Sequence, residues 1–322
     1  MPSLRSRAFA VAVAVLAATA VGCGGSGDRT AAAPSTVTSL ATSTTMAPPP
    51  TATNLPTTSL PTPTTLAATT ITSTTPPGPL PPADVAPFTR GDDLAVALAI
   101  AETALADPAT PPQDFPNWAW LQQQAYRDLV VHPDWQDAAR EQVPPELREA
   151  FDLNLLAGTQ LRRLTSPQPA LPGWRIVAPP PLDELRGYYT DAETEFGVPW
   201  NVLAAIHLVE TRFGRILGDS HAGARGPMQF LPSTWDAYGQ GDIEDPGDAI
   251  AAAARYLVAH GAPGDLEGAL WAYNHSDLYV TAVIAHAEAM DRYDHYLAVY
   301  HQWRVYYRTV DGDVLLEEGY GS

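Results

Sequence analysis

Apolar residues recur every three or four positions through most of the chain from residue 92 to residue 300, with polar residues between them. This spacing places apolar side chains on one face of an α-helix. Glycine and proline separate the periodic stretches, and four glycines stand where left-handed C-terminal caps belong: Gly197, Gly214, Gly239 and Gly261. The pattern predicts helices over residues 92–107, 117–131, 145–164, 182–196, 199–213, 233–238, 246–260, 266–275 and 277–300.

The period of the pattern changes after residue 300. No alternation typical of a β-strand interrupts the helices over residues 181–300, whereas Trp303, Val305 and Tyr307 alternate with other residues. Asp311-Gly312 then separates two β-prone runs, as a two-residue hairpin loop would. The predicted fold class is therefore mainly α with a small C-terminal β-hairpin.

Composition divides the chain into five predicted parts. They are a signal peptide at 1–22, a linker at 23–86, a helical accessory region at 87–172, a main helical domain at 173–300 and a hairpin extension at 301–322. The accessory region contains no group of residues that looks reactive, so we assign it a packing or positioning role.

The N-terminus carries the pattern of an export signal. Arg5 and Arg7 precede an apolar run over residues 8–21, which is shorter than the about 20 residues that span a bilayer. The run ends in Ala20-Val21-Gly22-Cys23, which resembles the lipobox of bacterial lipoproteins. The resemblance implies that Cys23 is lipidated and anchors the chain to the outer face of the cell membrane, within the cell wall. The alternative is ordinary secretion with an incidental cysteine.

The segment that follows Cys23 favours disorder. Residues 30–83 contain no charged residue and are dominated by Thr, Pro, Ser and Ala. Such a sequence buries too little apolar surface to offset the entropy of ordering its backbone. We expect a disordered tether, either bare or carrying O-linked sugars on its threonines.

Charge and cysteine content exclude several classes of function. The chain has 36 acidic and 18 basic residues and a formal net charge of -18, which argues against a nucleic-acid partner. A single cysteine and eight scattered histidines give no spacing typical of metal ligands. We therefore expect no metal and no cofactor.

One acidic residue stands on the apolar face of a predicted helix. Glu210 shares that face with Ile206 and falls in the last turn of the helix over 199–213. An apolar environment and the negative end of the helix dipole both raise the pKa of a carboxyl group, as a general acid near neutral pH requires. The alternative is a buried Glu210 paired with an arginine, for example Arg225 or Arg255.

Three segments occur in a fixed order around this glutamate: residues 209–215, residues 223–235 and residues 272–276. They resemble the Glu, Gly-x-Met-Gln and Ala-Tyr-Asn signatures of peptidoglycan lytic transglycosylases, whose domain resembles goose-type lysozyme. The resemblance covers about residues 182–290 and implies a lysozyme-like helical catalytic domain.

The resemblance also implies a role for each matching residue. Glu210 matches the single acid/base, which protonates the glycosidic oxygen between N-acetylmuramic acid (MurNAc) and N-acetylglucosamine (GlcNAc). The same residue then takes the proton of the muramic 6-hydroxyl, so that a 1,6-anhydro ring forms. Met228 and Gln229 match a loop that contacts substrate, Tyr273 the residue whose hydroxyl orients the catalytic Glu, and Asn274 its polar neighbour in the cleft.

Three departures from the family pattern surround these residues. Thr211 replaces a serine, Pro227 replaces a leucine, and His275-Ser276 replace Ala-Gly. They leave open whether cleavage is exo or endo. The aromatic residues Trp235, Tyr238 and Trp271 fit either sugar stacking or core packing.

The expected protein is an exported, monomeric lytic transglycosylase that acts on peptidoglycan glycan strands. Two alternatives remain at this point. A muramidase on the same fold would let water attack in place of the 6-hydroxyl, and a wall-binding lipoprotein would lack catalysis.

Overall fold

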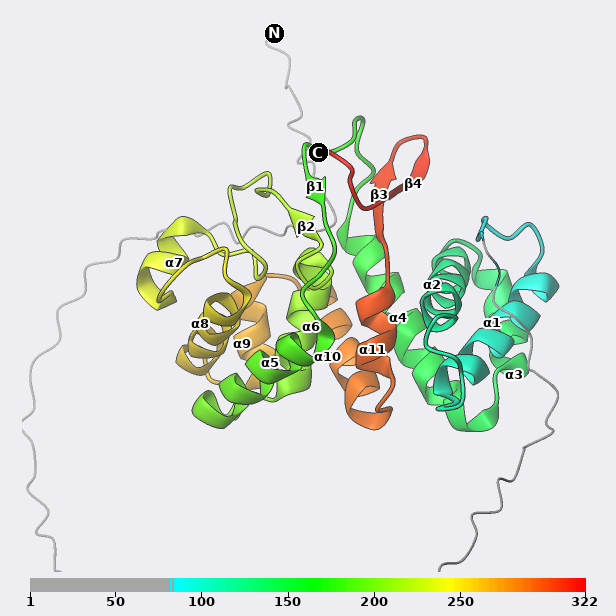
Figure 1. The fold of residues 1–322 in the computed structure, drawn as a ribbon, viewed down its shortest axis with the longest axis horizontal. Coiled ribbons are helices and arrows are strands. Elements are labelled where there is room, and N and C mark those ends of the chain that lie inside the picture. Colours follow the sequence, from blue (N-terminus) through cyan, green and yellow to red (C-terminus); the bar gives the residue numbers. More distant parts are fainter. Residues whose placement is uncertain (1–81, 83) are drawn as a thin grey trace, which may run out of the picture. The chain divides into compact units, whose positions relative to one another are not determined.

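The computed structural model describes residue 82 and residues 84–322. The predicted signal peptide at 1–22, the predicted lipidation site Cys23 and most of the predicted linker at 23–86 lie outside the described residues. Within the described part of the chain the elements are mainly helices, with two small antiparallel sheets of two strands each (Figure 1). The expected mainly α fold class is therefore confirmed. No helix in this part combines the length and the apolar character needed to cross a membrane.

The first helices have an apolar core of their own. They are α1 (Gly91–Ala106), α2 (Phe115–Val131), a 3-10 turn (Pro133–Trp135), α3 (Gln136–Gln142), a second 3-10 turn (Pro145–Leu147) and α4 (Arg148–Leu164). Leu94, Leu98, Leu129 and Phe151 pack together in this core with almost no exposed surface. The sequence pattern did not predict α3, because its seven residues are too few to establish a helical period.

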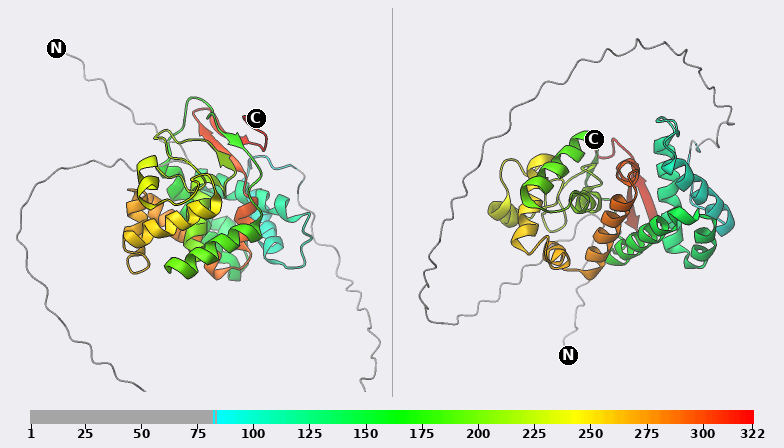
Figure 2. Two further views of the ribbon diagram at one scale, coloured as in Figure 1. Left: turned by 60° about the vertical axis from the view of Figure 1, so that its left-hand side comes forward. Right: turned by 90° about the horizontal axis from the view of Figure 1, so that it is seen from below.

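The remaining helices form a second group. They are α5 (Leu182–Phe196), α6 (Trp200–Thr211), α7 (Pro232–Tyr238), α8 (Pro246–Ala259), α9 (Leu266–Tyr273), α10 (Asp277–Arg292) and α11 (Tyr296–Gln302). In this group α6 contacts α5, α8, α10 and α11, and Leu203 and Ile206 of α6 have no exposed surface. Helix α4 packs along α10 and so joins the first helices to this group (Figure 2).

The expected helix over 277–300 is wrong, because the structure breaks it in two. Helix α10 ends at Arg292, Tyr293 adopts an extended conformation, and α11 begins at Tyr296. Both helices bury tyrosines in the same core, as Tyr279 and Tyr300 show. The apolar pattern therefore continues across the break and conceals it.

The structure also contains a strand pair that the sequence pattern did not predict. Strand β1 (Arg175–Ile176) pairs antiparallel with β2 (Ile216–Leu217), on either side of α5 and α6 in the sequence. Two residues are too few to show the alternation of a β-strand. The prediction that no strand interrupts the main helical domain is therefore wrong.

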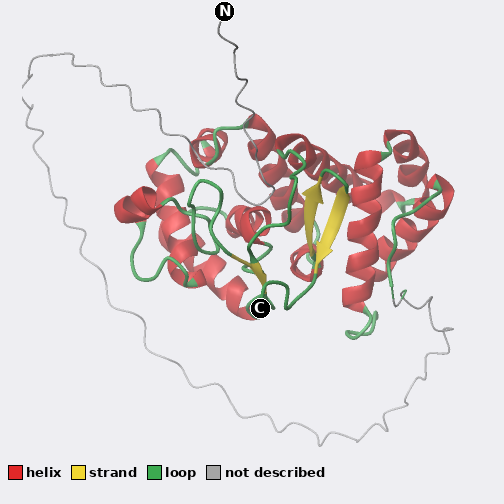
Figure 3. Ribbon diagram, turned by 90° about the horizontal axis from the view of Figure 1, so that it is seen from above, coloured by secondary structure: helices red, strands yellow, loops and turns green. Residues whose placement is uncertain are grey.

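The predicted C-terminal hairpin is confirmed, with its turn shifted by one residue. Strands β3 (Val305–Thr309) and β4 (Gly312–Leu316) pair antiparallel, and Thr309 lies opposite Gly312. The two turn residues are therefore Val310 and Asp311. The apolar face of the hairpin packs against β1 and β2 in a small separate core, and Figure 3 shows the strands close together beside the helices.

Candidate active site

Glu210 lies in the last turn of α6 and is almost completely buried, with 4% of its surface exposed. The hydroxyl of Tyr279 donates a hydrogen bond of 2.7 Å to its Oε1 atom. The arginine pairing considered from the sequence is absent among the described residues. Arg225 instead forms an ion pair with Asp219, and Arg255 donates to a backbone carbonyl.

The environment of Glu210 favours its protonated form. Burial raises the pKa of Glu210 to about 8, while the hydrogen bond from Tyr279 opposes part of this rise. The exposed carbonyl dipoles at the end of α6 act in the same direction as burial. At pH 7 the carboxyl group is therefore mostly protonated and has a proton to give, because a pKa one unit above the pH means roughly a tenfold excess of acid.

The end of α6 is an unusual turn in which glycine does not provide the cap. Arg212 and Phe213 both adopt left-handed backbone conformations, with φ of 55° and 59°, before Gly214 continues the turn. Left-handed backbone costs on the order of 1 kcal/mol or more for a residue with a Cβ atom. The predicted cap at Gly239 is also wrong, because its φ is -72°.

Hydrogen bonds from Thr211 hold this turn against the loop that carries the Gly-x-Met-Gln segment. The Thr211 hydroxyl donates to the carbonyl of Pro227 at 2.7 Å and accepts from the amide of Gly214 at 3.1 Å. Pro227 cannot donate a backbone hydrogen bond, but its carbonyl is the group used here. Thr211, the residue next to Glu210, is thus hydrogen-bonded to the substrate loop implied by the resemblance.

A tyrosine other than the expected Tyr273 donates a hydrogen bond to Glu210. The Tyr273 hydroxyl donates to the backbone carbonyl of Met228 at 2.6 Å, whereas Tyr279 reaches Glu210. The contact with Glu210 that the resemblance implied for Tyr273 is therefore made by Tyr279 in this structure. The two rings lie nearly parallel, 6.4 Å apart.

Sequence reasoning missed Tyr279, because its position on α10 matches an ordinary apolar core position. One signal was available. A buried tyrosine needs a partner for its hydroxyl, and the sequence had already placed Glu210 on an apolar helix face, where a carboxyl group needs a partner or a proton.

The substrate loop is tightly constrained beside this pair. Met228 is fully buried, so its side chain offers no surface to a sugar in this structure. The next residue, Gln229, has a left-handed backbone with φ of 52°, and its Nε2 donates to the carbonyl of Gly226 at 2.9 Å. Its Oε1 atom is buried and has no hydrogen-bond partner in the described part of the chain.

Asn274 follows α9 and has a matching unsatisfied group. The residue is 2% exposed, and its Nδ2 is buried with no partner among the described residues. Gln229 and Asn274 thus carry one acceptor and one donor without partners, both buried in this structure. Buried polar atoms without partners are costly, and their presence in a native fold calls for a ligand or water.

The three candidate sugar-stacking residues differ in exposure. Trp271 is 46% exposed, while Trp235 and Tyr238 are half-buried. Trp235 contacts the ring of Phe230 and Tyr238 that of Tyr256, as core residues do. Trp271 is the most exposed of the three, although its ring also contacts that of His275, with 4.5 Å between the ring centroids. Within residues 82 and 84–322, no group of three or more His, Cys, Asp and Glu side chains is arranged to hold a metal ion.

Comparison with known proteins connects this site to a family. Residues 187–295 match the family model described as "Transglycosylase SLT domain". The "Membrane-bound lytic murein transglycosylase F" of Thiobacillus denitrificans is 37% identical to this chain over 80 residues, which are 25% of this chain and 17% of that protein. The chain thus matches less than a fifth of the length of this relative. No solved structure gives a significant match.

The residues matched by the family model include the site residues described above. Glu210, Met228, Gln229, Tyr273 and Asn274 all fall between residues 187 and 295, and so does Tyr279. The resemblance to SLT-type lytic transglycosylases is therefore confirmed for this part of the chain.

Proposed function

We propose that this protein is a lytic transglycosylase of peptidoglycan and that Glu210 is its single general acid/base. The observation that carries the proposal is a buried carboxyl group with a pKa of about 8, held by a tyrosine hydroxyl within an SLT domain. The T. denitrificans relative is named for the same activity on murein, the polymer also called peptidoglycan.

Cleavage begins with proton transfer from Glu210. The protonated carboxyl gives its proton to the β-1,4 glycosidic oxygen between MurNAc and GlcNAc, and the bond from that oxygen to the anomeric carbon breaks. The carboxylate formed in this step then takes the proton from the muramic 6-hydroxyl. That oxygen bonds to the anomeric carbon and closes a 1,6-anhydro ring, so no water is consumed and Glu210 regains its proton.

A second carboxylate is unnecessary in this mechanism. Most glycosidases use a pair of carboxylates, but a neighbouring N-acetyl group can stabilise the anomeric centre in place of one of them. Such an acetamido group carries one N–H donor and one carbonyl acceptor. The unsatisfied Oε1 of Gln229 and Nδ2 of Asn274 are complementary to these two groups.

Tyr279 positions the acid in this proposal. Its hydrogen bond to Oε1 restrains the carboxyl group and stabilises the carboxylate that appears after the first proton transfer. Tyr273 and Thr211 position the substrate loop through the carbonyls of Met228 and Pro227.

The N-terminal part of the chain supports a location in the cell envelope. The export signal at 1–22 and the lipobox-like sequence at Cys23 support a lipid anchor on the outer face of the membrane. The uncharged linker at 23–86 would let the catalytic domain reach glycan strands above that surface. We propose that the protein acts there as a monomer.

Mass spectrometry of digested sacculi tests this function. The transglycosylase produces anhydro-MurNAc ends that are one water lighter than the reducing ends left by a muramidase. Glu210→Gln should lower turnover by at least about 100-fold, because a general acid typically contributes 10²–10⁴-fold. Glu195→Gln, which changes an exposed glutamate on α5, is the matched control and should retain full turnover.

Two results would contradict the proposal. Reducing MurNAc ends in place of anhydro ends would identify a muramidase. Unchanged cleavage by Glu210→Gln would remove Glu210 from the mechanism.

A further inference from the structure

A small cavity lies between α2, α4 and the C-terminal hairpin, away from the contacts of Glu210. Its volume is about 100 Å³, several times the about 10–15 Å³ that a single water molecule needs. Residues from α2, α4, α10 and both hairpin strands line it, together with Arg212 at the end of α6. The cavity therefore forms where the first helices, the second group of helices and the hairpin meet.

The charge of this cavity is opposite to that of the protein. Four arginines line it, Arg127, Arg162, Arg212 and Arg308, but only one acidic residue, Asp313. Four positive charges and one negative charge leave a formal charge of +3, in a chain whose net charge is -18. This cluster of positive charge needs an explanation, because uncompensated like charges repel at close range in a partly buried site.

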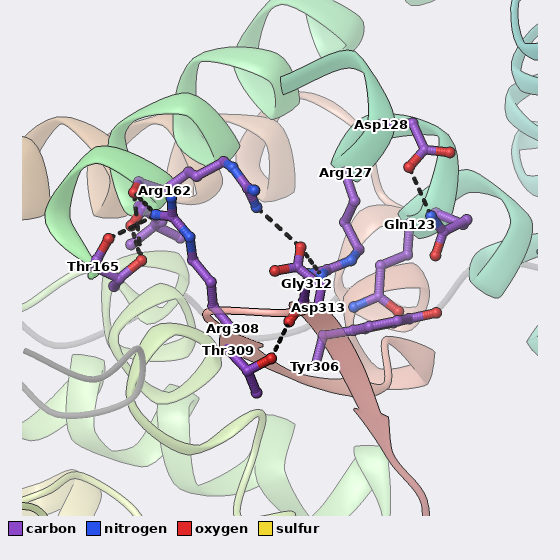
Figure 4. Close-up of polar contacts among 12 residues, drawn as sticks. Gln123, Arg127, Asp128, Arg162, Thr165, Tyr306, Arg308, Thr309, Gly312 and Asp313 are labelled. Atoms are coloured by element: carbon purple, nitrogen blue, oxygen red, sulfur yellow. Dashed lines mark hydrogen bonds and ion pairs between the residues drawn. The ribbon is translucent and has the colours of Figure 1, made fainter. Parts of the chain in front are cut away.

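Hydrogen bonds between the hairpin and the helices explain only part of the positive charge of these arginines. Asp313 of β4 accepts hydrogen bonds from Arg127 at 2.5 Å and from Arg162 at 2.9 Å, both at the same Oδ2 atom (Figure 4). Arg308 of β3 donates to the carbonyls of Arg162 and Thr165 at the end of α4. These bonds hold the hairpin against the helices. Asp313 is the single carboxylate among their acceptors, so it neutralises only one of the four positive charges.

Most donors of the four guanidinium groups remain unused within the described chain. A guanidinium group carries five N–H donors, yet each of the four makes its hydrogen bonds through a single nitrogen. Arg212 has one such bond, to the carbonyl of Leu208, and no carboxylate partner. The cavity is thus lined by guanidinium donors that no acceptor of the described chain occupies, and the side chains of Arg127 and Arg162 are 24% and 30% exposed.

His286 of α10 adds an independent sign of a missing ligand. The residue lines the cavity and is 2% exposed, and neither of its ring nitrogens has a hydrogen-bond partner in the described part of the chain. A neutral imidazole has one N–H donor that an acceptor in the cavity could satisfy. Burial and the nearby charge of Arg212 lower the pKa of His286 to about 3, so the ring is neutral at pH 7.

We infer that this cavity binds a small oxyanion, a carboxylate or phosphate group, through the guanidinium groups of Arg162, Arg212 and Arg308. Such a group presents several acceptor oxygens to forked donors, and arginine is the side chain best suited to this geometry. The anion would offset the excess positive charge and accept the N–H of His286. The inference does not depend on the reaction proposed for Glu210.

Calorimetric titration of the full chain tests the site with two probes, inorganic phosphate and acetate, at fixed ionic strength against chloride. We expect one binding event per chain for at least one probe, and the tighter probe identifies the phosphate or the carboxylate class. Arg212→Gln and Arg308→Gln should each weaken binding at least about tenfold, because each removes a charged donor. Arg140→Gln is the matched control, since Arg140 pairs with Asp152 in an exposed ion pair elsewhere.

A measurement on the unaltered protein covers the case in which a variant fails to fold. The ring resonances of His286 should shift saturably in NMR spectra as the bound probe is added. No binding of either probe, binding unaffected by the arginine substitutions, or an unmoved His286 resonance would each overturn the inference.

Discussion

The Tyr279 hydroxyl lies 2.7 Å from Oε1 of Glu210, and both side chains are buried. Burial and this hydrogen bond have opposing effects on the pKa of Glu210. Burial raises the pKa of Glu210, while the hydrogen bond lowers it, so that the resulting value of about 8 stays near neutral pH. A general acid works best when its pKa lies near the pH at which the enzyme operates.

Turnover should depend on pH through Glu210. The proposed mechanism needs the protonated acid, so turnover should fall about tenfold per pH unit above a pKa of about 8. Initial rates on sacculi measured between about pH 3 and pH 10 check this alkaline limb of the pH profile. A decline centred near pH 4.5, the ordinary pKa of a glutamate, would show that Glu210 is not the group that limits the rate.

The free energy of unfolding should also depend on pH through Glu210. The folded state binds this proton more tightly than the unfolded state, because the pKa rises from 4.5 to about 8 on folding. The stabilisation is therefore complete below pH 4.5 and is lost as the pH rises to about 8, at about 1.4 kcal/mol per pH unit. Urea unfolding at several pH values should show this slope in the wild type, and its absence in Glu210→Gln.

Replacing Tyr279 by Phe should change both the rate and its pH dependence. The substitution removes the bond that opposes the rise in pKa, so the alkaline limb should move to higher pH. A hydrogen bond to a charged group is worth about 1.5–3 kcal/mol, so the maximal rate should fall by about tenfold or more.

Tyr273→Phe is the matched comparison for Tyr279→Phe. Its lost hydroxyl contacts the Met228 carbonyl, so the substitution should raise KM and leave the alkaline limb in place. The reverse pattern, in which Tyr273→Phe moves the limb and Tyr279→Phe does not, would contradict the assignment of the two tyrosines.

Thr211 should stabilise the fold through its hydroxyl. Thr211→Val removes the bonds to the Pro227 carbonyl and the Gly214 amide, which leaves buried polar groups unpaired and should cost about 1–3 kcal/mol in the free energy of unfolding. Thr211→Ser keeps the hydroxyl and should cost clearly less. Equal losses in chemical denaturation would show that the methyl group of Thr211, and not its hydroxyl, is what matters.

Much of the fold followed from local patterns. Most helix positions and the hairpin were predictable, because helical period, turn residues and β-alternation each depend on neighbours a few positions apart. The short elements were not. Helix α3, the pair β1–β2 and the break between α10 and α11 involve too few residues to produce a period.

The sequence by itself determined that Glu210 stands on the apolar face of its helix and in the last turn, because these properties depend only on spacing along α6. Its partner depended on the tertiary structure, since Tyr279 lies 69 residues away on another helix. The same holds for the four arginines around the cavity, which come from α2, α4, the end of α6 and β3. Hydrogen bonds and charge clusters form between side chains that folding brings together, and no period in the sequence records which ones will meet.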